Sequence, residues 1–298
     1  MYDRILIPVD GSDEANRAAR WGLQLAAELD AAVDVIHVVE RKATRLTRTG
    51  KQRKALLERG EGILATVEEM AAERDQSITT ELREGSPTEQ ISEYARDRNA
   101  ELVVVGRQGM TGLGKRLLGG VTEQLLYWSD VPVLVVTDGD GAPEARTAFS
   151  NVLVPTDGSE NAASAIDPAI EIGRQYGSTL HVLNVVDLQA AGGVFDAGGL
   201  EKEFVERLEE SGREAVDAAV AEIVEAAPDL DVESAVVRTS SFDGAAAGIR
   251  EYVAEHDVDL VVMGSHGRSN LKRQVLGSVA STLVRSVDVP VLIVRRES

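Results

Sequence analysis

The sequence predicts an α/β protein made of two tandem, doubly wound domains, each a parallel sheet with helices on both faces. Two observations carry this prediction. Short apolar runs alternate with segments whose apolar residues recur every three or four positions, which is the period of an amphipathic helix. Three landmarks of the first half return in the same order in the second half, which indicates a duplication.

The repeated landmarks are an apolar run ending in Asp-Gly-Ser, an apolar run ending in glycine, and an Asp-Val-Pro segment that leads into a final strand. They occur at 5–12, 102–106 and 130–136, and again at 152–159, 260–264 and 288–294. Polar turn residues gather at 138–143 between the two sets. We therefore expect domain 1 at residues 1–138, a linker at 139–147 and domain 2 at 148–298.

Each element of the first copy follows from its pattern. Apolar runs predict strands at 4–9, 32–39, 77–83, 101–106 and 133–137. Helical periodicity predicts helices at about 14–29, 52–74, 88–98 and 120–129. The first helix is the clearest, because Ala15, Ala18 and Gly22 share one face and Ser12 stands where an N-cap is expected. The second copy repeats this order.

Composition limits the class of protein. The 298 residues are 43% hydrophobic but only 4% aromatic, so the cores should be aliphatic. The absence of cysteine excludes disulfides and thiolate metal sites, and four scattered histidines predict no metal site. A strand pattern beginning at Arg4 and the lack of an apolar run of spanning length predict a cytoplasmic protein without signal peptide or membrane insertion.

The charge balance is strongly acidic. Fifty acidic residues against 31 basic residues give a net charge of −19. This predicts no general binding to nucleic acid or to anionic membranes, since both would be repelled. An acidic surface of this kind is typical of an organism with a salty cytoplasm, and an ordinary acidic mesophilic protein is the alternative.

One motif carries chemistry in both copies. Gly264, Gly267 and Gly277 follow an apolar strand, and Ser278 begins an amphipathic run that predicts a helix. A strand that leads through a glycine loop into a helix N-terminus offers free backbone N–H groups to an anion. In open parallel sheets such ligands lie beyond the carboxyl ends of the strands, where Asp10 and Asp157 are also expected.

Together, the Pro-Thr-Asp157-Gly-Ser segment, the glycine motif with its fixed spacing and the Val-Pro-Val-Leu-Ile-Val strand resemble the universal stress protein family. The resemblance covers both copies and is closest to the tandem form and to the ATP- or AMP-binding branch. It implies two Rossmann-like domains, each with a five-stranded sheet of order 3-2-1-4-5. It also implies ATP or AMP at the junction of strands one and four. Mg²⁺ can accompany ATP there.

The resemblance also implies the ligand-binding residues. In copy two they are Pro155, Thr156, Asp157, Val185, Met263, Gly264, Gly267, Arg268, Gly277, Ser278 and Val279. In copy one they are Val9, Asp10, Val38, Gly106, Gly109, Gly119, Gly120, Val121 and Thr122. Copy one departs from the motif at Gly120, which replaces the hydroxyl of Ser278. A hydrogen bond to a charged group contributes roughly 1.5–3 kcal/mol, so site 2 should bind about ten- to hundredfold better than site 1.

Several features also have structural interpretations. Asp-Gly-Ser alone can be a turn and a helix cap, and Gly119-Gly120 alone can be a packing feature. His37 and His181 are expected to be structural, and His266 is not expected to be catalytic because copy one has Gln108 there. Residues 109–116 nearly match a Walker A loop, but Arg116 replaces the Ser or Thr that would hold Mg²⁺.

The segments after each second strand differ between the copies. Residues 41–54 contain seven basic residues, Arg41, Lys42, Arg45, Arg48, Lys51, Arg53 and Lys54, and no acidic residue. Residues 192–199 are rich in glycine instead. A lid over site 1 or a docking patch for a protein partner is one interpretation of the basic segment, and a solvated loop is the other.

These features predict an adenine-nucleotide-binding stress-response or regulatory protein with an unidentified protein partner. A slow Mg-dependent ATPase and a scaffold that keeps the fold without a ligand are the alternatives, and no catalytic residue is assigned. The last strands each follow a proline and end in apolar runs, so the two copies are expected to pair through them as a pseudo-dimer. A further homodimer of the whole chain is left open.

Overall fold

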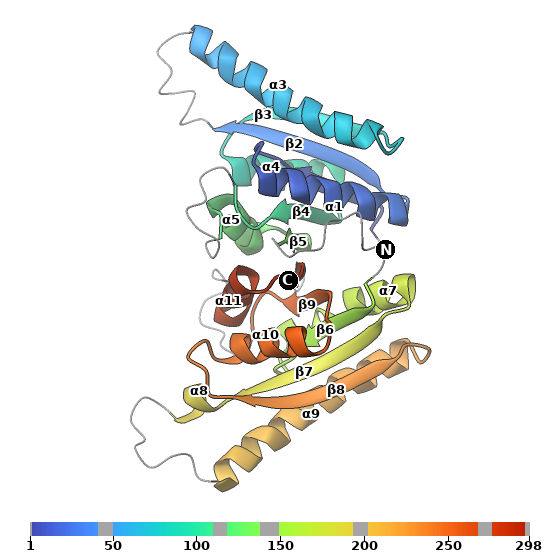
Figure 1. Cartoon of the computed structure of the whole chain (residues 1–298), viewed down its shortest axis with the longest axis vertical. Helices are drawn as coiled ribbons and strands as arrows, with labels where there is room; N and C mark the ends of the chain where they lie inside the picture. Colours follow the sequence, from blue (N-terminus) through green and yellow to red (C-terminus); the bar gives the residue numbers. More distant parts are fainter. Residues whose placement is uncertain are drawn as a thin grey trace. The chain divides into compact units, whose positions relative to one another are not determined.

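The computed structural model describes residues 2–40, 50–109, 118–137, 149–192, 202–267 and 276–295. The chain divides into two compact units, unit 1 at Met1–Pro143 and unit 2 at Glu144–Ser298 (Figure 1). Within the described ranges, no helix combines the length and the apolar character that crossing a membrane requires. The expected linker at 139–147 and most of the basic segment at 41–54 lie outside those ranges.

Unit 1 alternates strands and helices from its first element. Its strands are β1 (Arg4–Pro8), β2 (Ala32–Glu40), β3 (Ile78–Gly85), β4 (Leu102–Gly106) and β5 (Val133–Val136). Its helices are α1 (Asp13–Leu29), α3 (Gly50–Ala72), α4 (Pro87–Arg98) and α5 (Gly120–Trp128). These bounds lie within two residues of the expected ones.

Unit 2 repeats the order with two changes, a divided first helix and a short extra helix. Its strands are β6 (Asn151–Pro155), β7 (Thr179–Asp187), β8 (Val232–Thr239), β9 (Leu260–Gly264) and β10 (Val291–Val294). Its helices are α6 (Glu160–Ala163), α7 (Ile166–Tyr176), α8 (Leu188–Gly192), α9 (Lys202–Ala226), α10 (Ala245–Glu255) and α11 (Ser278–Ser286).

Both units have the predicted doubly wound fold. The strand order is β3-β2-β1-β4-β5 in unit 1 and β8-β7-β6-β9-β10 in unit 2, and neighbouring strands within each unit pair in parallel. The order 3-2-1-4-5 is therefore confirmed for each copy. In each unit the strand order reverses beside the first strand, so a crevice is expected between β1 and β4 and between β6 and β9.

Helices pack on both faces of each sheet because right-handed crossovers on the two sides of the first strand place them on opposite faces (Figure 1). In unit 1, α1 contacts α3 and α4 contacts α5. In unit 2, α7 contacts α9 and α10 contacts α11. The strands between these layers, such as β4 and β9, are buried along their whole length and are correspondingly continuous in apolar residues.

The first helix of unit 1 begins as its sequence predicts. The Ser12 hydroxyl oxygen accepts a hydrogen bond from the Ala15 N–H at 3.1 Å, which confirms the N-cap. Ser159 caps α6 in the same way through the Ala162 N–H at 3.2 Å. In unit 2 the helix is then interrupted at Ser164, because Pro168 has no N–H to donate to the Ser164 carbonyl and its ring disfavours a continuous helix there.

Candidate functional site

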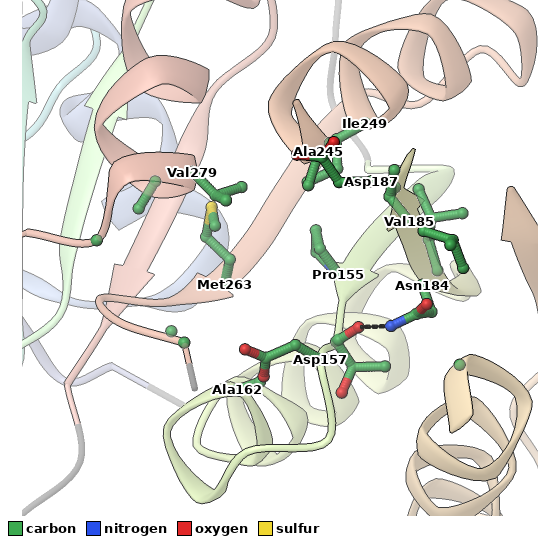
Figure 2. A pocket seen from close by; sticks show the side chains of 18 of the residues that line it. Pro155, Asp157, Ala162, Asn184, Val185, Asp187, Ala245, Ile249, Met263 and Val279 are labelled. Carbon is green, nitrogen blue, oxygen red and sulfur yellow. Dashed lines mark hydrogen bonds between the residues drawn. The ribbon is translucent and has the colours of Figure 1, made fainter. Parts of the chain in front are cut away.

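The candidate site of unit 2 lies where β6, β7 and β9 end. A cavity of about 540 Å³ opens there, which is within the range of small-molecule sites. Its walls come from these three strands and from helices α6, α8, α9, α10 and α11 (Figure 2). The sheet therefore brings together segments that are far apart in the sequence.

The turn after β6 presents Asp157 to the cavity. Gly158 has a positive φ of 76°, a conformation that glycine adopts without strain. This turn lets the Asp157 Oδ1 accept the Ser159 N–H at 3.0 Å. The other carboxylate oxygen lies against the α-carbon of Gly267, where a Cβ would collide with it. The carboxylate and the glycine loop therefore lie in direct contact.

The glycine loop is held close to the first helix of the unit. A Cβ at Gly264 would overlap the carbonyl oxygen of Asn161, so only glycine allows this approach of β9 to α6. The Gly277 N–H donates to the Ser265 carbonyl at 2.8 Å, which ties the end of the loop to its beginning. Helix α11 then begins at Ser278, with Gly277 as an N-cap that supplies no side-chain acceptor. Its first-turn N–H groups are the kind of donors that bind anions.

The other end of the cavity is bordered by β7, α9 and α10. The Asn184 side-chain amide donates to the Thr156 carbonyl at 2.8 Å and so ties β7 to the turn after β6 (Figure 2). Asp187 ends β7, and its Oδ1 accepts the N–H groups of Gln189 and Ala190, each at 3.0 Å. Ala245 and Ile249 of α10 complete this end of the wall.

The structure brings together ten of the eleven residues expected in copy two. Lining the cavity are Pro155, Thr156, Asp157, Val185, Met263, Gly264, Gly267, Gly277, Ser278 and Val279. Arg268 lies outside the described residues.

Sequence reasoning missed the lining residues on helices remote from the motif. They are Ala162, Ala190, Leu208, Ser211, Gly212, Ala245 and Ile249, together with Leu183, Asn184, Val186, Asp187, His266 and Ala280 beside expected positions. Asn184, a polar residue between Leu183 and Val185 in β7, was an available signal. Ser211 and Gly212 gave none, because small residues on a helix also serve ordinary packing.

The corresponding residues of unit 1 adopt the same turn. The Asp10 Oδ1 accepts the Ser12 N–H at 3.0 Å and the Ser12 hydroxyl at 2.6 Å. A Cβ at Gly109 would collide with the other Asp10 oxygen, and the Gly119 N–H donates to the Arg107 carbonyl at 2.9 Å. Both copies thus build the same contact between aspartate and glycine loop.

Other expected residues of unit 1 are less available to a ligand. The Thr122 side chain is buried, and its hydroxyl donates to the Gly106 carbonyl at 2.9 Å. Val9 is also buried, and its carbonyl accepts a hydrogen bond from His37 Nδ1 at 2.7 Å. Val38 and Val121 are half-buried, and Gly120 is exposed at the start of α5.

His37 and His181 make hydrogen bonds inside the fold, and His266 borders the cavity. His37 bonds the Val9 carbonyl, and His181 contacts Tyr252 and Asn151. His266 Nδ1 lies 2.9 Å from the Ser265 hydroxyl. In the described part of the chain, no group of three or more histidine and carboxylate side chains is placed to hold a metal ion.

Comparison with known proteins gives one consistent result. The model of the universal stress protein family matches residues 1–137 and again 148–295. A universal stress protein of Mycolicibacterium smegmatis is 30% identical over 305 residues, covering 98% of this chain and 96% of that protein. A universal stress protein of Methanocaldococcus jannaschii is 39% identical over 140 residues, covering 46% of this chain and 82% of that protein.

The fold is also found in solved structures. A universal stress protein from Archaeoglobus fulgidus superposes with a TM-score of 0.71 at 21% identity, covering 99% of this chain and 97% of that one. At this level of identity the likeness concerns the fold alone.

Proposed function

The chain belongs to the universal stress protein family, and from that premise we propose that it is a regulatory protein whose unit 2 binds an adenine nucleotide, ATP or AMP. The observation that carries the proposal is that three segments of unit 2 meet at one cavity. The glycine loop, the start of α11 and the Asp157 turn all border it, although they come from separate parts of unit 2.

The two ends of the cavity suit the two ends of a nucleotide. Backbone N–H groups at the start of α11 and the hydroxyl of the exposed Ser278 suit the phosphates. The apolar wall of Val185, Ala245 and Ile249 suits a flat purine. Asp157 also lines the cavity, and its carboxylate suits the hydroxyl groups of the ribose, since it can accept hydrogen bonds from both.

The net charge of −19 makes the local donors essential, because the protein as a whole repels an anionic ligand. Mg²⁺ would reduce that repulsion when the ligand is ATP. We therefore expect ATP binding to strengthen with salt and with Mg²⁺, and AMP binding to depend on them less.

The proposal is tested by titration calorimetry of the whole chain with ATP and with AMP in concentrated potassium chloride, with GTP as the control ligand. The variant Ser211→Trp places a large side chain in the wall of the cavity on α9 and should weaken binding at least a hundredfold. Glu210→Trp is the matched control, because Glu210 is exposed and does not line the cavity. Adenylate binding unaffected by Ser211→Trp would contradict this site.

Mass spectrometry of the denatured, freshly purified protein adds an independent measurement. Co-released adenine nucleotide supports binding, and ADP with free phosphate would favour the slow ATPase instead. The cytoplasmic location, the salt-adapted surface, the protein partner and the pairing of the two copies stay predictions.

A further inference from the structure

One position near the glycine loop carries a charged side chain in unit 1 and a neutral side chain in unit 2. Glu14 in unit 1 and Asn161 in unit 2 each stand two positions after the capping serine. Each lies against the first glycine of the motif. A Cβ at Gly106 would come within 2.9 Å of the Glu14 carbonyl, and one at Gly264 would overlap the Asn161 carbonyl. The two residues therefore occupy the same place in the fold.

The Glu14 side chain is directed to the loop that should receive a phosphate. Its Oε2 accepts the Gln108 backbone N–H at 2.6 Å. This distance is short, as expected when a carboxylate accepts from an amide. Gln108 lies between the motif glycines Gly106 and Gly109, so the loop of unit 1 already holds an anion that belongs to the protein.

Unit 2 has no such charge at this position. Asn161 is a neutral amide, and the residue that corresponds to Gln108 is His266, which lines the open cavity. A phosphate that approached the loop of unit 1 would meet both an occupied N–H group and a fixed negative charge. Both effects disfavour a second anion at close range.

We propose that Glu14 is a built-in anion that closes the loop of unit 1 to phosphate, so that the chain binds one nucleotide, at unit 2. The inference rests on the proposed function and goes beyond it, because it names the residue pair that decides which copy binds. The duplicated motif thus provides one ligand site, in unit 2. Its copy in unit 1 has a loop N–H that already donates to a carboxylate of the protein.

The test exchanges the two residues and counts the bound nucleotides by titration calorimetry with ATP. Glu14→Asn gives unit 1 the residue of unit 2, so we expect a second binding event, at least tenfold tighter than any second event in the unaltered chain. Asn161→Glu should weaken the event at unit 2 at least tenfold. The two variants change the same position in opposite directions, so a general loss of folding cannot imitate both results.

Asp13→Asn is the matched control. It removes the same charge from the same helical turn, but Asp13 is exposed, and we expect one nucleotide per chain as before. Circular dichroism confirms that each variant is folded. A second event in Asp13→Asn as strong as in Glu14→Asn would overturn the inference, because general charge would then explain the effect.

The outcomes separate this inference from the proposed function. One nucleotide per chain in Glu14→Asn, with undiminished affinity in Asn161→Glu, means that Glu14 only braces the loop; the inference is then wrong and the proposed function stands. No binding in the unaltered chain or in Glu14→Asn would overturn both.

Discussion

The two units have different buried side chains at the same position near the amino end of their second strands, an aspartate in unit 1 and a histidine in unit 2. In unit 1 the fully buried Asp34 on β2 accepts hydrogen bonds from Arg4 and Arg98, each at 3.0 Å. Tyr94 donates to the same carboxylate at 3.4 Å. Asp34 lies opposite Leu6 of the first strand in the sheet.

Unit 2 has a cluster without arginine at this place. His181 lies opposite Leu153 in the matching register of β6 and β7. Its Nδ1 is 3.1 Å from the Tyr252 hydroxyl and its Nε2 is 3.4 Å from the Asn151 Oδ1. Tyr252 in turn stacks on His256, with ring centroids 3.7 Å apart.

The comparison teaches that three of the four positions differ together between the units. The ionic set of Arg4, Asp34 and Arg98 is replaced by Asn151, His181 and His256, while a tyrosine is kept. A buried carboxylate without its arginines, or an arginine without its carboxylate, is costly. The buried charge and its charged partners therefore have to differ together, while the uncharged tyrosine can stay.

At the carboxyl end of the first strand, by contrast, the partner that stays the same is a backbone carbonyl. His37 on β2 and Asn184 on β7 are different side chains, yet each donates a hydrogen bond to the carbonyl of the residue after the strand proline. The backbone carbonyl needs a donor in both units, and the side chain that supplies it is free to vary. Position in the fold thus decides the role more than residue identity does.

The largest difference between the units should follow from removing the buried charge. Asp34→Asn deprives Arg4 and Arg98 of their counter-charge. Because these arginine side chains are 31% and 40% exposed, solvent reduces the loss, and unit 1 should be destabilised by about 2 kcal/mol. His181→Asn breaks only neutral hydrogen bonds and should destabilise unit 2 by about 1 kcal/mol. Hydrogen exchange resolved by unit measures both, and equal losses would contradict the contrast drawn between the clusters.

The next largest effect concerns the hydroxyl at the start of the last helix. Ser278→Gly should weaken nucleotide binding at unit 2 ten- to hundredfold, the equivalent of roughly 1.5–3 kcal/mol. Gly120→Ser adds the hydroxyl to unit 1, where a Cβ meets nothing within 4 Å. Alone it should give little binding while Glu14 holds the loop, and combined with Glu14→Asn it should give the most. If calorimetry shows that Gly120→Ser by itself gives strong nucleotide binding at unit 1, this order is wrong.

The smallest effect is the response to pH. Burial lowers the pKa of His181 below its ordinary value, against the raising effect of the Glu233 carboxylate, while His256 lowers it further. The folded unit therefore favours neutral His181, and the unfolded chain takes up the proton more readily. The stability from this group is complete above the ordinary histidine pKa of about 6.5 and is lost as pH falls below it toward the lower pKa of the folded state.

Unit 2 should consequently lose stability on acidification from neutral pH, and His181→Asn should reduce that loss. Exchange rates of β7 amides measured at several pH values between 7 and 5 test this. The β2 amides of unit 1 are the internal reference, because the substitution lies in the other unit and should leave their exchange rates unchanged at every pH. A pH response of β7 that is unchanged in the variant would assign the effect to another group.

Much of the site could be predicted because its residues belong to local patterns. The glycine motif and the Asp-Gly-Ser turn are contiguous stretches whose geometry depends on local backbone conformation. Ser211, Gly212, Ala245 and Ile249 could not be predicted, because they reach the cavity only through the packing of α9 and α10 on β7. The buried bond of Thr122 was hidden for the same reason.

The amino-acid sequence by itself determined the duplication, the order of strands and helices, and the place of a glycine loop in each copy. These follow from periodicity and from residues with restricted or permissive backbones, which act over a few positions. Only the tertiary structure decided that the Glu14 carboxylate lies on the loop of unit 1 and that a cavity opens in unit 2. Such contacts join segments nearly a hundred residues apart, and chain folding rather than local preference brings them together.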